Sequence, residues 1–239
     1  YVNVNVQKPS KISLGEIRNV AILDIDKKEF RGSYSFTEIG DAPLSEKLKT
    51  IIEGKKKPKN PILKDDYFGK IIPDKLISKL VDNGHYSIAD RDKLDRILDE
   101  QKLSLSGLIS SDDEPIIGEL IGVDAFVIGS GKYFIIDKGG WFTHANDNKT
   151  FKDVFYKVER EISLELKFEI ISVESGEIVA LIEEKKKKTV KANGDDLESA
   201  FANLSNWHTT IDKLADSILN KIIKQIAPYY KKTSKLIKT

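Results

Sequence analysis

The chain has 239 residues, of which 40% are hydrophobic and 32% are charged, a composition typical of a globular domain with a well-solvated surface. Lys and Arg total 39 against 38 Asp and Glu, and the resulting net charge of +1 gives no long-range attraction to nucleic acid or to an anionic membrane. The chain contains no cysteine, which excludes disulfides and thiolate metal sites. No stretch approaches the roughly 18 consecutive apolar residues of a transmembrane helix.

The first half of the chain alternates short apolar runs with helical patterns. Residues 1–16 are polar and contain Pro9 and Gly15, so they predict an extended N-terminal arm. Strands are predicted where short apolar or β-branched runs occur, and helices where apolar residues recur at i, i+3 and i+4. On this basis we expect strands at 17–26, 85–90 and 124–129, and helices at 41–53, 67–81, 91–101 and 116–121.

The second half has the period of a sheet and then of a covering helix. Residues 162–170 alternate strictly between apolar and polar side chains, which predicts a strand with one solvated face. A turn at 173–177 leads into a partner strand at 178–182. From Trp207 to Ile226 the apolar residues form one helical stripe, and Pro228 closes it.

These elements together predict an α/β (α+β-like) fold, a layered mixed β-sheet flanked by helices, with a late β-hairpin and a C-terminal amphipathic helix. We expect three parts in the chain: the arm at 1–16, a single α/β domain at 17–230 and a basic tail at 231–239.

The sequence offers little conventional catalytic chemistry. Residues 129–132, GSGK, lack the other positions of a phosphate-binding loop, and His85, His144 and His208 show no metal-ligand spacing. Asp24 and Asp26 follow an apolar run as the paired aspartates of some phosphatases do, so a phosphoesterase using these two residues is one alternative. We otherwise expect a protein that is not an enzyme, with no catalytic residue, metal or cofactor.

Residues 84–131 carry an ordered series of short motifs. A strand ends at Asp90 and Arg91, a helix of pattern L-x-x-I-L-x-E-Q runs from Leu94 to Gln101, and a Leu-Ser-x-Ser-Gly turn follows at 103–107. A Gly-x-Asp step and a strand ending in glycine complete the series. Its marker residues are Asp90, Arg91, Leu94, Leu98, Gln101, Gly107, Gly122, Asp124 and Gly129.

In the order and spacing of these motifs the chain resembles the CsgG family, exported bacterial lipoproteins typified by the curli secretion channel. The marker residues are mainly structural in our interpretation. Asp90 is expected to cap a helix, Asp124 to bind a local backbone N–H at a strand entry, and Gly107, Gly122 and Gly129 to occupy turns.

The resemblance implies a location in the periplasm or at the outer membrane, with attachment through a lipid anchor upstream of Tyr1. It also implies partners: copies of the same chain in a homo-oligomer, or other envelope or secreted proteins, and no nucleic acid. Our first hypothesis is a non-catalytic assembly or interaction module of the cell envelope. The alternative within the family is a subunit of an oligomeric outer-membrane secretion channel.

Channel relatives place two membrane-inserted hairpins in each subunit, and the two corresponding segments here are 131–161 and 183–201. In the first segment the leading strand is expected to be only a few residues long, and in the second the run of consecutive lysines excludes a lipid-facing side. We therefore expect no pore from this chain alone. Trp141 and Phe142, expected on a loop, either contact a partner or fill the edge of the core.

Overall fold

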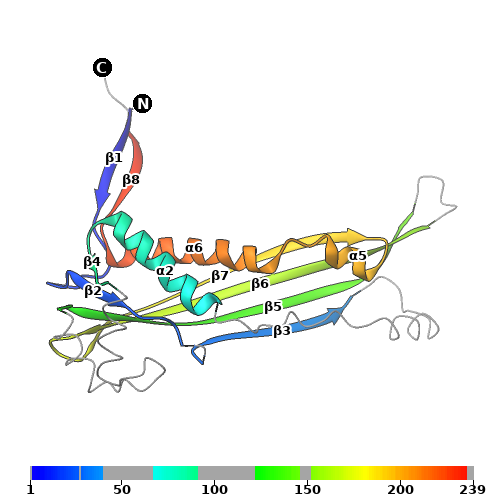
Figure 1. Cartoon of the computed structure of the whole chain (residues 1–239). Coiled ribbons are helices and arrows are strands. Elements are labelled where there is room, and N and C mark those ends of the chain that lie inside the picture. The colour runs from blue at the N-terminus through cyan, green and yellow to red at the C-terminus, as the bar shows by residue number, and fades with distance from the viewer. Residues whose placement is uncertain (1, 27, 40–66, 91–121, 146–151, 236–239) are drawn as a thin grey trace.

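The body of the protein is a sheet of long strands with helices packed on one of its faces (Figure 1). The computed structural model describes residues 2–26, 28–39, 67–90, 122–145 and 152–235. Its strands are β1 Val2–Lys8, β2 Asn19–Ile22, β3 Phe30–Glu38, β4 Ser87–Ile88, β5 Ala125–Ala145, β6 Lys152–Ser172, β7 Ile178–Gly194 and β8 Tyr229–Lys235. Its helices are α2 Tyr67–Asn83, α5 Leu197–Ala202 and α6 Trp207–Ile226.

Strands β5 and β6 form the spine of the sheet. They pair antiparallel over their full length, from Ala125 with Ser172 to Ala145 with Lys152. On the outer side of β6, β7 pairs antiparallel from Ile178 to Gly194. Along the outer side of β5, β2 and then β3 pair parallel in succession, and β4 extends the sheet beside β2. The sheet is therefore mixed, and the predicted fold class, with its late hairpin and its C-terminal helix, is confirmed.

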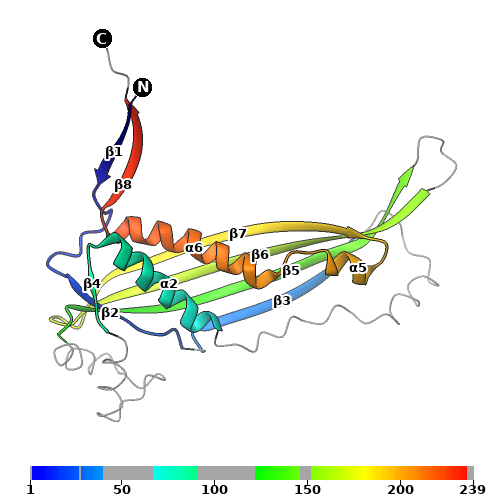
Figure 2. The same ribbon diagram turned by 45° about the horizontal axis from the view of Figure 1, so that its top comes forward.

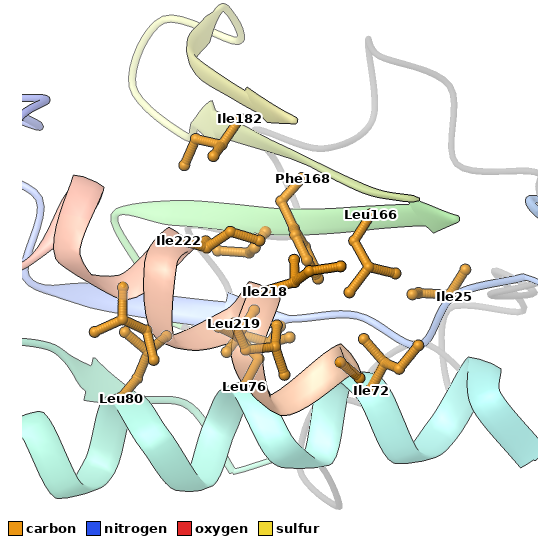
Figure 3. Packing of buried hydrophobic residues seen from close by; sticks show 14 of the residues in the cluster. Ile25, Ile72, Leu76, Leu80, Leu166, Phe168, Ile182, Ile218, Leu219 and Ile222 are labelled. Atoms are coloured by element: carbon orange, nitrogen blue, oxygen red, sulfur yellow. The ribbon is translucent and has the colours of Figure 1, made fainter. Parts of the chain in front are cut away.

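The alternation of residues 162–170 produces the covered face of the sheet, because alternate side chains of a strand point to opposite faces. Ile162, Leu164, Leu166, Phe168 and Ile170 are all at most 1% exposed. The apolar stripe of α6 lies on them, and α2 packs alongside, as the cluster of aliphatic side chains in Figure 3 shows. Each fully buried Leu, Ile or Phe side chain contributes about 1.5–3 kcal/mol through removal of apolar surface from water.

Four aromatic rings close the end of this core where α6 begins. The ring of Phe30 lies 5.8 Å from that of Phe68 and 5.6 Å from that of Tyr133, and Tyr133 stacks on Trp207 at 5.9 Å. The ring of Phe30 also occupies the space that a Cβ at residue 131 would need, which requires the glycine found there. Beyond these rings the sheet continues without α6.

The opposite face of β5, β6 and β7 is charged and carries cross-strand ion pairs. Lys132 and Lys185 lie on either side of Glu165, with Nζ–Oε distances of 3.6 and 3.5 Å. Exposed pairs of this kind contribute about 0–1 kcal/mol each, so they keep the face solvated rather than hold the sheet together. The other described pairs across β6 and β7 are Lys187–Glu161 and Lys191–Glu159.

The remaining predicted elements differ from the structure mainly in length. Helix 67–81 is confirmed as α2, which continues to Asn83. The strands predicted at 17–26 and 85–90 shrink to four and two paired residues, whereas the strand predicted at 124–129 extends to Ala145. The helices predicted at 41–53, 91–101 and 116–121 fall outside the described residues.

The predicted arm and tail pair with each other. Strands β1 and β8 form an antiparallel ribbon, with Val2 opposite Lys235 and Lys8 opposite Tyr229, and it projects from the body at the end where α6 stops (Figures 1 and 2). At its base, Tyr86 donates from Oη to the carbonyl of Ile226 at 2.6 Å. The division of the chain at residues 16 and 230 stays a prediction.

Candidate interaction site at the distal end of the sheet

The two spine strands continue beyond their neighbours at the end of the sheet away from the ribbon. The last residue of β7, Gly194, pairs with Tyr156, and the last residue of β3, Glu38, pairs with Gly139. We name the segments 140–145 and 152–154 the hairpin extension. Within the described part of the chain these segments pair only within the β5–β6 hairpin, so both outer edges leave backbone N–H and C=O groups open to a further strand.

Two cross-strand aromatic pairs stand at the base of the hairpin extension. The rings of Trp141 and Tyr156 meet edge to face at 5.2 Å, and those of Phe142 and Phe155 stack at 6.0 Å. Both pairs follow from the register, which places their members directly opposite each other. Residues 141 and 142 therefore lie in β5 and not on a loop, which corrects the prediction.

Because Trp141 and Phe142 are adjacent in a strand, their side chains lie on opposite faces of the sheet. Trp141 is partly buried and packs against a small satellite cluster formed by Tyr156, Val158, Ala200 and Leu204. Its Nε1 is buried and has no hydrogen-bond acceptor among the described residues. Phe142 is half-buried on the other face, with Lys157 Nζ 5.6 Å from its ring centre, and its role as a partner contact stays a prediction.

Helix α5 covers the start of the hairpin extension and borders an open groove. Asp196 caps the helix, accepting the backbone N–H of Ser199 at 2.8 Å, while the Ser199 hydroxyl accepts the N–H of Asp196 at 3.1 Å. A Cβ at Gly194 would collide with the backbone of α5 at Ala200, so this glycine permits the close packing. The groove, about 440 Å³, is lined by Phe155, Asn193, Gly194, Asp195, Ser199 and Asn203.

A buried ion pair lies between the aliphatic core and the hairpin extension. Asp137 has no exposed surface, and its two oxygens accept from Arg160 Nε and Nη2, each at 2.7 Å. Tyr34 of β3 donates from Oη to the same carboxylate at 3.1 Å, and Arg160 also stacks over the ring of Phe201. Burial, followed by the charge of Asp137, raises the pKa of Tyr34 well above its usual range.

Sequence reasoning missed this cluster. The available signals were an aspartate inside the apolar run 133–137, YFIID, and an arginine on the covered side of the pattern in β6. Without the register of β5 with β6, the sequence does not show that Asp137 and Arg160 are partners. In the structure Asp137 stands directly opposite Arg160, and this pairing also locks β3 to the spine through Tyr34.

Two of the described marker residues, Asp124 and Gly129, differ from expectation in what they contact. The carboxylate of Asp124 accepts the backbone N–H groups of Arg18 and Asn19, each at 2.7 Å, so it ties the starts of β5 and β2 together instead of binding locally. Gly129 lies within β5, where a Cβ would come within 2.9 Å of Ile25 and Phe168; it permits close packing and is not a turn residue.

Gly122 has φ of 75°, the left-handed conformation expected of a turn glycine. Asp90 is exposed just after β4. The other marker residues lie outside the described part of the chain: Arg91, Leu94, Leu98, Gln101 and Gly107.

The two aspartates of the phosphoesterase alternative stand at a turn. Asp26 uses Oδ1 to accept the backbone N–H of Lys28 at 2.8 Å, and its carbonyl accepts the N–H of Phe30, which starts β3. Asp24 is exposed and Asp26 half-buried. Across the described ranges, no group of three or more His, Cys, Asp or Glu is arranged to hold a metal ion.

The structure describes most of segment 131–161 and all of segment 183–201, which carry membrane-inserted hairpins in channel relatives. In the first segment the expectation of a short leading strand is wrong, because β5 runs unbroken to Ala145 and pairs with β6 throughout. In the second segment, residues 183–194 continue β7 against β6, and α5 follows at once. That the lysine run excludes a lipid-facing side stays a prediction. Among the described helices, none is long and apolar enough to cross a membrane.

The fold and the site define a mixed α+β protein with helices on one sheet face and a projecting β-hairpin. The family model for the curli production assembly/transport component CsgG matches residues 56–134. The match includes α2, the marker region and the first half of β5, and it confirms over about a third of the chain the resemblance predicted from the sequence. A search of curated proteins finds no match.

Several solved structures align with the chain at low identity and low TM-score. A homolog of a neuraminyllactose-binding hemagglutinin from Helicobacter pylori aligns over 92% of this chain and 88% of its own, with 11% identity and a TM-score of 0.39. The C-terminal domain of LpoB from Salmonella enterica covers 71% of this chain and 82% of its own, with 12% identity and a TM-score of 0.28. A PelC dodecamer from Paraburkholderia phytofirmans covers 94% and 96%, with 13% identity and a TM-score of 0.31.

Proposed function

We propose that this chain is a non-catalytic assembly or interaction module of the bacterial cell envelope that binds its partners through the hairpin extension. The family match supports the assembly role, because the matched family is one of assembly and transport components. The observation that carries the proposal is that segments 140–145 and 152–154 pair only within the β5–β6 hairpin among the residues that the structure describes. Periplasmic location or outer-membrane attachment is part of the proposal and follows from the family.

The binding mode that fits these edges is addition of a strand. A strand entering beside β6 would continue the line of β7 beyond Gly194, along the groove next to Phe155. A strand entering beside β5 would continue the line of β3 beyond Glu38 and bring carbonyl groups near Trp141, whose Nε1 is buried without an acceptor. The partner we propose first is a second copy of the chain, since each copy offers one open edge on either side.

The length of the hairpin formed by β5 and β6 supports the channel alternative. The described open face of these strands, however, does not offer an apolar surface to lipid. A membrane-spanning strand needs about 9–11 residues with an apolar outer side. The leading arm of the hairpin extension has six residues, 140–145, and nearer the body the open face carries ion-paired Lys and Glu side chains. We therefore rank the secretion-channel function second. On that alternative, the chain would be a subunit that reaches the membrane only as part of a larger assembly.

The self-association part of the proposal is tested by measuring molar mass with light scattering during size exclusion, over a wide range of protein concentrations. We expect an oligomer that dissociates on dilution. The variant with Phe142→Ser and Phe155→Ser should shift toward monomer, because it removes the stacked aromatic pair at the base of the open edges.

A matched control is Phe134→Ser. Phe134 is 38% exposed on the same open face of β5 but lies within the part of the strand that is paired on both sides. Its mass distribution should follow that of the unmodified chain. A chain that stays monomeric at every concentration, or a control that dissociates as much as the double variant, would contradict self-association through the hairpin extension.

A further inference from the structure

The net charge of +1 hides a strong separation of charge along the chain. Residues 1–15 and 217–239 contain eight lysines and no aspartate or glutamate. The rest of the chain contains 31 Lys and Arg against all 38 Asp and Glu. The electrostatic potential near a surface depends mainly on the charges within about 10 Å of it. The net charge of the whole chain therefore does not predict whether one end of the molecule attracts anions.

The fold joins the outer parts of these two acid-free segments in the β1–β8 ribbon. Strands β1 and β8 pair over seven residues, so Lys8 of the N-terminal segment lies on the same ribbon as Lys231, Lys232 and Lys235 of the C-terminal segment. The base of the ribbon adjoins the last turn of α6, where Lys224 stands over the ring of Tyr229 at 5.5 Å. The positive charges of the two chain ends thus add to each other.

In the ribbon, Asn5, Gln7, Lys8, Tyr230 and Lys231 are exposed, whereas Val6, Tyr229 and Thr233 are half-buried. Figures 1 and 2 show the ribbon projecting from the body with no described helix or strand against either face. An isolated two-stranded ribbon is at best marginally stable in water, so it profits from a surface to lie on. Tyr230 is 71% exposed on it, and the sequence of β1 alternates valine with asparagine or glutamine.

We propose that the β1–β8 ribbon is a docking surface for an anionic phospholipid bilayer. The lysines of the two acid-free chain ends complement a negative lipid surface, and tyrosine is an aromatic residue enriched at the membrane–water interface. This inference goes beyond the proposed function, because the ribbon and the hairpin extension lie at opposite ends of the molecule (Figure 1).

The probe is a flotation assay with vesicles of pure phosphatidylcholine and vesicles of equimolar phosphatidylcholine and phosphatidylglycerol. We expect binding to the anionic vesicles only, with an affinity that falls as NaCl is raised. A lysine near an anionic surface contributes about a fivefold factor in affinity, so the variant with Lys231→Gln, Lys232→Gln and Lys235→Gln should bind roughly a hundredfold more weakly.

The matched control removes the same charge from the edge of the open sheet face, with Lys185→Gln, Lys187→Gln and Lys191→Gln. These lysines are ion-paired with glutamates, and we expect less than about a threefold effect on vesicle binding. A control that loses as much affinity as the ribbon variant would overturn the proposal. So would equal binding to neutral vesicles, or no binding to either kind.

Two further arms keep the test decisive. Circular dichroism verifies that the ribbon variant is folded, and if it is not, Lys8→Gln with Lys11→Gln removes charge from the other chain end instead. Polyglutamate serves as a second probe: if it binds through the ribbon lysines while anionic vesicles do not, the surface fits an acidic protein and the lipid proposal fails.

Discussion

The same two strands, β5 and β6, pass through two regions with different kinds of packing. In the half covered by α2 and α6, β6 presents only aliphatic or aromatic side chains to the helices, from Ile162 to Ile170. In the distal half the covered face carries Asp137 and Arg160 and then the ring of Tyr156. The difference begins where α6 begins, at the four aromatic rings around Tyr133.

The contrast arises because α6 is too short to cover the whole length of β5 and β6. A 20-residue α-helix is about 30 Å long, whereas a 21-residue strand spans about 70 Å, so one helix covers less than half of such a strand. The short helix α5 covers part of the remainder. The buried ion pair and the aromatic cluster fix the strand register in the region where aliphatic burial is small.

The largest loss of stability is expected from a cavity in the half of the sheet covered by α2 and α6. Phe168→Ala removes one of the largest fully buried side chains, and we expect a loss of about 4 kcal/mol in the free energy of unfolding. Urea denaturation followed by circular dichroism measures it. The exposed Phe134→Ala is the control, and a similar loss there would show that the aliphatic core does not dominate stability.

The next largest effect is expected in the distal half. Asp137→Ala leaves the Arg160 guanidinium, 12% exposed, without its partner, and should cost about 3 kcal/mol. Replacing both residues, as Asp137→Leu with Arg160→Met, should restore most of the stability, because two apolar side chains need no ionic partner. Hydrogen exchange should rise first in β3 and the distal ends of β5 and β6. If the double variant is as unstable as the single one, burial of an unpaired charge is not the cause.

The smallest effect sharpens the role of Tyr34. Tyr34→Phe removes one hydrogen bond to Asp137 and should cost about 1 kcal/mol at neutral pH. The pKa of Tyr34 is raised in the folded state, so its contribution is fully present below its unfolded pKa of about 10 and is lost as the pH rises beyond that value. The stability difference between the unmodified chain and the variant should therefore shrink in alkaline solution. A difference that stays constant across that range would contradict this account.

The sequence predicted the elements whose environment is set by their own periodicity. Residues 162–170 alternate because one side of β6 is always covered, and the stripe of α6 matches the face that covers it. The lysine run was harder to interpret, because consecutive charges give no period. In the structure Lys185 and Lys187 reach Glu165 and Glu161 on the open face, while Lys186 binds Ser217 of α6 over the edge.

The candidate site was predicted less well than the fold. Trp141 and Phe142 stood out as an aromatic pair, but their environment depends on where β3 and β7 end, and no local pattern marks those ends. The role of Gly129 likewise depends on Ile25 and Phe168, which come from two other segments of the chain.

The long alternating strand, the amphipathic helix, the absence of cysteine chemistry and the resemblance to the CsgG family all follow from the residues alone. Only the tertiary structure decided that Asp124 binds the backbone of Arg18 and Asn19, that Tyr34 and Arg160 share Asp137, and that the two chain ends form one ribbon. Most of these partners are separated by more than 100 residues. Local periodicity reports which face of an element is buried, whereas the identity of a distant partner is fixed only when the sheet register closes the chain on itself.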